Sequence, residues 1–270
     1  MLALLSVILV SGQLKAQISI APSFVFVDEN SGVGNVFVSN NSDKAYEVSV
    51  NFAFGYPGSD NEGNLIMNYN DSTAFSQYAL DPIIRAFPRS FILKSREQRT
   101  VRLQVIPKQR RIDGFYFTRM KVMAKPQTAD VTEPQTEGIG TKINFNFEQI
   151  TAVFYHKGKV TTGVVVKDIN VLQKEGTLQL LPHLVRTGNA PFLGSILAKL
   201  KDADGKVVAE AQSTTTVYFD ETRRLDMKLD KVTPGTYTLE MNFETHRNDM
   251  MISDLVQAPK VVQEKKIEIK

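Results

Sequence analysis

Apolar and polar residues alternate along much of this chain with a period of two. The clearest run covers residues 46–54, where Tyr46, Val48, Val50 and Phe52 alternate with polar or small residues. Successive side chains of a β-strand point to opposite faces of a sheet, so this pattern predicts a strand that is buried on one face. The same pattern recurs at residues 101–105, 143–147, 196–200, 225–229 and 237–243.

Turn-forming residues separate these runs. Residues 40–43, 202–206 and 233–235 are rich in Asn, Asp, Gly and Pro and lie between apolar runs, as hairpin connections require. The only helix we expect is a short one near residues 73–80. The chain is therefore predicted to be all-β. Two longer polar segments, 56–71 and 126–140, are expected to be loops.

Many short strands without an internal repeat predict two tandem β-sandwiches. The polar run at residues 156–159 precedes a new apolar stretch, which places the boundary near residue 157. The expected domains are residues 17–157 and 158–270.

The first ten residues form an apolar run of the length of a signal-peptide core, too short to span a membrane. Small residues follow and favour cleavage after Ala16, so that residues 1–16 are a secretory signal. The mature chain then begins at Gln17 in an extracytoplasmic space. No Lys or Arg precedes the run, and this leaves a misplaced start or a buried strand as alternatives.

Composition excludes several classes of function. The chain is 42% hydrophobic and 23% charged, with a formal net charge of +3, and no basic stretch interleaves with aromatics, so a nucleic-acid partner is not expected. There is no cysteine, which excludes disulfides, thiolate nucleophiles and a lipid-modified cysteine. The three histidines, His156, His183 and His246, are few for a metal site.

The glycine-containing and acidic motifs do not complete a catalytic or binding pattern. Residues 32–34 and 138–142 lack the spacing of phosphate-binding loops, and residues 202–205 lack the ligands of a calcium loop. No Gly-x-Ser-x-Gly nucleophile turn occurs. We therefore expect no enzyme, no cofactor and no metal site.

Several blocks, in order, are similar to those of a known family. Residues 18–26 and 36–48 (VFVSNNSDKAYEV), 87–93 with 100–105, 113–117, 143–147 with 153–155, and 188–192 (GNAPF) carry the likeness. Over residues 17 to 200 the chain resembles the PapD-like pilus chaperones, which have two immunoglobulin-like domains arranged as a boomerang.

The resemblance implies that the first domain captures a client subunit by β-strand addition. The edge strand would be residues 143–147, with Ile143, Phe145 and Phe147 filling the groove of the client. In the alternative, these side chains face the protein's own core. Apolar residues become even-numbered from Ile150 onward, which we interpret as a β-bulge.

The chain also departs from the family pattern. An arginine and a lysine that clamp the client's terminal carboxylate in the family are replaced by Phe24 and Ala152, so this clamp is not carried over. The resemblance places Asp113 and His156 at the interdomain hinge. A histidine there would make the interdomain contact sensitive to pH, whereas a solvated linker histidine would not.

The sequence thus predicts a non-enzymatic, periplasmic, chaperone-like protein whose partner is a secreted or pilus-like subunit. The alternative is a structural or adaptor component held permanently in an envelope assembly, which the missing clamp favours. An exposed edge strand also makes self-association an expectation. No insertion into the membrane is expected.

Overall fold

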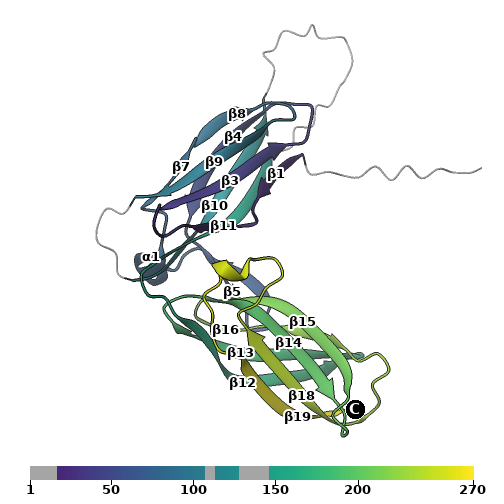
Figure 1. Ribbon diagram of the computed structural model, residues 1–270. Helices are drawn as coiled ribbons and strands as arrows, with labels where there is room; N and C mark the ends of the chain where they lie inside the picture. Colours follow the sequence, from purple (N-terminus) through teal and green to yellow (C-terminus); the bar gives the residue numbers. More distant parts are fainter. Residues whose placement is uncertain (1–16, 107–112, 128–145) are drawn as a thin grey trace, which may run out of the picture.

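The computed structural model describes residues 17–106, 113–127 and 146–270, and it shows two β-sandwiches that meet end to end at an angle (Figure 1). Within these ranges every regular element is a strand, apart from one short α-helix and one 3-10 turn. The prediction of an all-β chain with two sandwiches is confirmed. Residues 1–16, the expected signal segment, lie outside the described residues.

The first sandwich pairs a four-stranded sheet with a five-stranded sheet. The four-stranded sheet has the order β1-β3-β9-β7, with β1 (Ile18–Ala21), β3 (Val33–Asn40), β9 (Gln98–Val105) and β7 (Ile84–Phe87). The five-stranded sheet has the order β2-β11-β10-β4-β8, with β2 (Phe24–Val27), β11 (Phe147–Lys157), β10 (Gly114–Pro126), β4 (Tyr46–Ala53) and β8 (Ser90–Leu93). The pairs are antiparallel except β2 with β11, which is parallel.

Alternation along these strands produces the core of the first sandwich. In β4, Tyr46, Val48 and Val50 are buried and Glu47 between them is exposed. Strands β3 and β9 show the same alternation and contribute to the same apolar cluster. Each large apolar side chain that is buried in this way contributes about 1.5–3 kcal/mol.

The second sandwich is built from the strands that follow β11. One sheet joins β12 (Thr162–Lys174), β13 (Thr177–Gly188) and β16 (Asp220–Thr222), with β17 (Leu225–Lys228) also paired to β13. The other has the order β15-β14-β18-β19, with β15 (Val207–Val217), β14 (Phe192–Lys201), β18 (Gly235–Glu244) and β19 (Val261–Ile269). The expected turn at residues 202–206 is a hairpin connection, in which the Asp202 carboxylate accepts a hydrogen bond from the Lys206 N–H (2.9 Å).

The segment 56–71 is not a plain loop, and this expectation was wrong. It forms a two-stranded hairpin, β5 (Tyr56–Ser59) and β6 (Leu65–Asn68), and leads into helix α1 (Ser72–Tyr78), which confirms the short helix. Asp71 caps α1 by accepting the Ala74 N–H (2.8 Å) and also accepts the Tyr56 hydroxyl (2.6 Å). These two contacts, the Ala74 N–H first, lower the pKa of Asp71.

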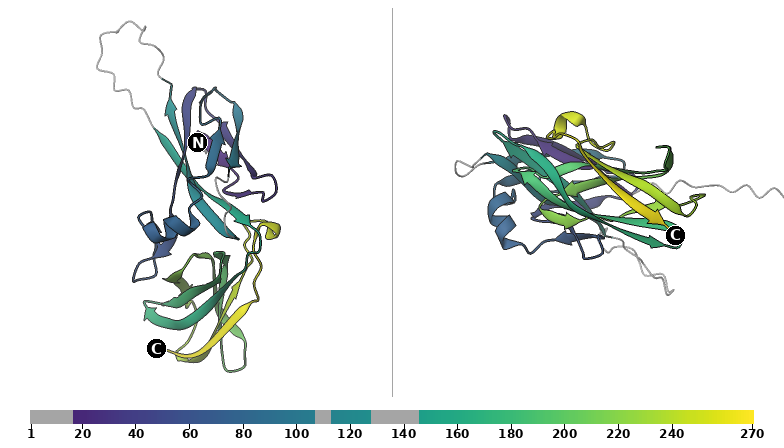
Figure 2. Two further views of the ribbon diagram at one scale, coloured as in Figure 1. Left: turned by 90° about the vertical axis from the view of Figure 1, so that its left-hand side faces the viewer. Right: turned by 90° about the horizontal axis from the view of Figure 1, so that it is seen from below.

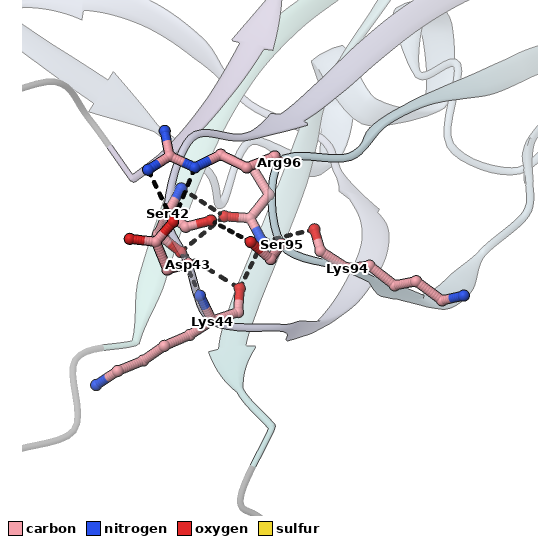
Figure 3. Close-up of polar contacts among 7 residues, drawn as sticks. Ser42, Asp43, Lys44, Lys94, Ser95 and Arg96 are labelled. Atoms are coloured by element: carbon pink, nitrogen blue, oxygen red, sulfur yellow. Dashed lines mark hydrogen bonds and ion pairs between the residues drawn. The ribbon is translucent and has the colours of Figure 1, made fainter.

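Asn40 connects two turns at the end of the first sandwich that is distant from the second. Its side chain is buried, and its amide donates to the carbonyl groups of Lys44 (2.6 Å) and Lys94 (2.8 Å). Its oxygen accepts the Ser42 N–H (3.0 Å). Figure 3 shows the surrounding contacts, among them the bond from the Ser95 hydroxyl to the Ser42 carbonyl. The polar motif within residues 36–48 therefore has a structural role.

We expect Asn40→Ala to lower the free energy of unfolding by about 1–3 kcal/mol, because it removes a buried side chain and leaves two partly buried carbonyl groups without a donor. Asp43→Ala is the control, since it removes only the solvent-exposed ion pair with Arg96 in the same turn (Figure 3). This control should leave stability nearly unchanged. Urea unfolding of both variants measures the difference, and equal losses would contradict the role assigned to Asn40.

Candidate functional site at the open edge of β11 and the interdomain cleft

Strand β11 is paired along its whole length on one side but only in part on the other. On one side it pairs with β10 from Phe147 to Lys157. On the other side β2 pairs with it only from Ala152 to Tyr155. Within the described ranges, no strand lies beside residues 147–151 on this second side. The main chain there is an open sheet edge, which can accept a further strand.

The side chains of β11 alternate regularly, and no bulge occurs between Phe147 and Ile150. The register with β10 is continuous, so the interpretation of a bulge was wrong. Odd-numbered residues face the core of the first sandwich: Phe147 is half-buried and its ring lies 5.8 Å from that of Tyr46. Even-numbered residues face the opposite way, and Ile150 is 43% exposed.

The sequence assigned Ile143, Phe145 and Phe147 to client binding. Ile143 and Phe145 lie outside the described residues. Phe147 is at the start of β11 and packs on the core, while Ile150 is the exposed apolar side chain on the open part of the strand. The role of the three residues stays a prediction.

On the even-numbered face of β11, the second sandwich covers the apolar residues near the end of the strand. Ala152 and Phe154 of β11, and Phe115 and Phe117 of β10, belong to a cluster at the junction of the two sandwiches. From the second sandwich this junction cluster includes Ala190, Leu193, Tyr218 and Leu255. The Phe117 and Tyr218 ring centroids are 4.6 Å apart. Burial on both faces of the strand, and not a bulge, explains why residues 152–155 are all apolar.

The hairpin β5–β6 also connects the sandwiches, and Figure 2 (left) shows it with α1 on one side of the junction. The Gly63 carbonyl at its tip accepts the Arg224 N–H (3.0 Å), and the Ser59 hydroxyl accepts the Thr222 N–H (3.0 Å). Gly63 has a φ of +78°, and a β-carbon there would lie 2.9 Å from the Arg224 nitrogen. Glycine is therefore required at this contact.

The predicted hinge residues Asp113 and His156 both lie next to the linker, which we define as residues 158–161. The Asp113 carboxylate accepts the Lys159 N–H (3.3 Å). His156 faces Glu29, with 3.4 Å between Nδ1 and Oε2, and the Gly158 N–H donates to the same carboxylate. From the second sandwich, Asn189 accepts the Thr161 N–H (2.8 Å). Both sandwiches thus hold the linker; a pH-dependent role for His156 stays a prediction.

Phe24 and Ala152, which replace the expected arginine and lysine, lie side by side as partners in the β2–β11 register. A different cation is nearby: the Arg247 guanidinium carbon lies 5.2 Å from the centre of the Phe24 ring. Arg247 is buried and forms two hydrogen bonds with the Asp249 carboxylate (2.8 and 2.6 Å), which neutralise its charge. The proximity of Arg247 was not foreseen, because it belongs to the other sandwich.

A cleft lies between β2 and the segment 249–254, on the side of the junction opposite the hairpin, where Figure 2 (left) shows the 3-10 turn η1 (Ile252–Asp254). It contains two cavities of about 260 and 320 Å³, and Phe26 and Asp254 line both. Met251 and Ile252 on its lip are 72% and 63% exposed. The cleft therefore combines exposed apolar side chains on its lip with carboxylates in its lining.

Comparisons with known proteins give structural similarity without sequence similarity. No family model and no curated protein matches the chain. The YadV chaperone is similar at 11% identity and a TM-score of 0.46, covering 94% of this chain and all of that one. The complex of CsuC with the tip subunit CsuE of Acinetobacter baumannii Csu pili is similar at 14% identity and a TM-score of 0.44. It covers 92% of this chain and 98% of that chain.

The CupB2 chaperone of Pseudomonas aeruginosa is similar at 10% identity and a TM-score of 0.43, with 92% of this chain and 98% of that chain covered. Similarity at this level concerns the fold and carries no information on function.

The described residues contain no group of three or more side chains suited to a metal ion. His183, one of the three histidines, lies between Asp168 and Asp220 and links β12, β13 and β16. In the same ranges, no helix has the length and apolar character to cross a membrane.

We expect Phe117→Ala to loosen the junction, since it removes a ring that contacts both sandwiches. The free energy of unfolding should fall by about 3–5 kcal/mol, and small-angle scattering should show a wider range of interdomain angles. Met120→Ala is the matched control, because Met120 is buried on the same strand but faces the core of the first sandwich. It should destabilise the protein without changing the scattering. A similar change of scattering in both variants would contradict the assignment.

A second prediction concerns the buried ion pair of Glu221 and Arg223, in which Nε of Arg223 lies 2.8 Å from Oε1 of Glu221. Arg223 also donates to the Gly58 carbonyl of the hairpin. Burial raises the pKa of Glu221 from 4.5 to about 7, against the opposing charge of Arg223. Between these values the folded state binds more protons than the unfolded chain, so stability should fall as the pH rises.

The total change should be up to about 3 kcal/mol from this group. Glu221→Gln should flatten the dependence of the melting temperature on pH between 4.5 and 7, whereas the exposed Glu210→Gln should not. An unchanged slope in Glu221→Gln would contradict the raised pKa.

Proposed function

We propose that the protein binds an extended segment of a secreted partner by adding it as a strand to the open edge of β11. The observation that carries this proposal is the unpaired side of residues 147–151, in a strand that pairs with β10 along its whole length and with β2 only from Ala152 to Tyr155. Main-chain hydrogen bonds to this edge would give affinity, and alternate side chains of the segment would pack on the exposed apolar surface.

Two further features support this function. Ile150 presents an apolar side chain on the open part of β11, and Phe24 and Phe26 continue this surface along the neighbouring strand β2. The junction cluster fixes the second sandwich beside this surface, so that the surface is in place before a partner binds. A preformed surface lowers the entropic cost of capturing a flexible segment.

In this proposal the protein is a chaperone for a pilus-like subunit, as the sequence resemblance implies, and it acts without catalysis. An N-terminal secretory signal would direct it to the periplasm. The second candidate is an adaptor that stays permanently in an envelope complex. The side-by-side Phe24 and Ala152 favour this candidate, because they supply no charge to bind a terminal carboxylate.

Affinity capture with single variants of the mature chain tests the proposal. Ile150→Asp places a charge on the open edge and should reduce partner recovery at least about tenfold while leaving the thermal transition nearly unchanged. Ile92→Asp is the control: Ile92 is 39% exposed on β8, at the opposite edge of the same sheet. It should retain the partner.

Equal recovery of the partner with Ile150→Asp and Ile92→Asp would contradict binding at β11. The composition of the captured material separates the two candidates. A chaperone should be recovered in both free and partner-bound pools, whereas an adaptor should be recovered in one complex of fixed stoichiometry.

A further inference from the structure

The open edge of β11 ends where β2 begins, and β2 forms one wall of the interdomain cleft. Strand β2 begins at Phe24, opposite Ala152, which is the residue after the open part of β11. Pro22 and Ser23 precede β2 and line the cavity of about 260 Å³. A segment added beside residues 147–151 would therefore end, on the side of β2, at residues that line this cavity.

The ionisable residues of this cleft are mainly acidic. Asp254 lines both cavities, and in the described structure it forms no ion pair and its carboxylate accepts no hydrogen bond. Asp28 and Glu29 line the larger cavity. Asp249 lines the smaller one, and its charge is matched by Arg247. Unpaired negative charge thus remains at the point that the end of an added segment would reach.

Positive charge is scarce at the same place. Among the described residues, no lysine or arginine lines either cavity, and His156, which lines the larger one, faces Glu29. The aromatic rings of Phe24 and Phe26 line the cleft beside these carboxylates. A cation is stabilised by carboxylates and by the faces of aromatic rings, whereas a terminal carboxylate would be repelled.

We propose that the cleft recognises a lysine or arginine side chain at the end of the captured segment, and not its terminal carboxylate. This inference rests on the proposed strand addition, and it defines the chemistry of the partner. Register along β11 is then set by an ion pair with Asp254 in place of a carboxylate clamp. The methylene groups of the basic side chain would lie on the Phe26 ring, which lines both cavities, whereas the Phe24 ring already contacts Arg247.

Synthetic peptides test this proposal in the full mature chain. Fluorescent peptides with one alternating Val/Thr sequence carry lysine, norleucine or glutamate at one end, in two sets with the variable residue at either terminus and all termini blocked. Fluorescence anisotropy measures the dissociation constants. In one of the sets, we expect lysine to bind about 5- to 10-fold more tightly than norleucine, and glutamate to bind more weakly than both.

Asp254→Asn should reduce the preference for lysine to within about twofold, and high salt should reduce it as well. Asp204→Asn is the control, because Asp204 is an exposed aspartate in the 202–206 turn of the second sandwich, and it should keep the preference. Binding of norleucine should be unchanged in both variants.

The outcomes separate this inference from the proposed function. Equal binding of the lysine and norleucine peptides, or a lysine preference that survives in Asp254→Asn, would overturn the basic anchor and leave strand addition standing. If neither variant nor wild type binds any peptide, strand addition itself is contradicted, and the basic anchor with it.

Discussion

The burial of both faces of β10 and β11 at the junction is the interaction on which the rest of the structure depends. In a two-layer sandwich, a strand buries one face in its own core and leaves the other to solvent. Here the second sandwich covers the outer face at the ends of β10 and β11, and Phe117 contacts Tyr218 directly. The angle between the sandwiches is therefore set by close packing.

Two polar attachments reinforce this packing. The hairpin β5–β6 extends from the first sandwich to the backbone of the second, and side chains from both sandwiches hold the linker. Gly158 has a φ of +62°, a conformation that favours glycine, and it lies against the Asp113 carboxylate. A cleft with walls held at three places keeps its shape when empty, which suits the capture of a flexible segment.

The open edge of β11 contrasts with the edge that β19 forms. Strand β19, at an edge of the second sandwich, carries Glu264, Lys265, Lys266 and Glu268 on exposed positions, and such charges discourage pairing with other chains. The open part of β11 has an exposed isoleucine and lies next to the aromatic residues of β2. An unprotected edge that carries an exposed apolar side chain and lies beside aromatic residues is typical of a binding site rather than of an inert surface.

The sequence by itself determined the strand content, most turns and the two-sandwich organisation, because period-two alternation and turn chemistry are local properties of the chain. It also identified Phe24 and Ala152 as uncharged positions. Only the tertiary structure decided which part of the β11 edge is open. It also decided that segment 56–71 docks on the second sandwich, that Asp254 lines the cleft and that Arg247 lies next to it. Alternation cannot tell a face that is covered by a distant domain from a face that is open to solvent. These contacts join residues far apart in the chain, for which no local pattern exists.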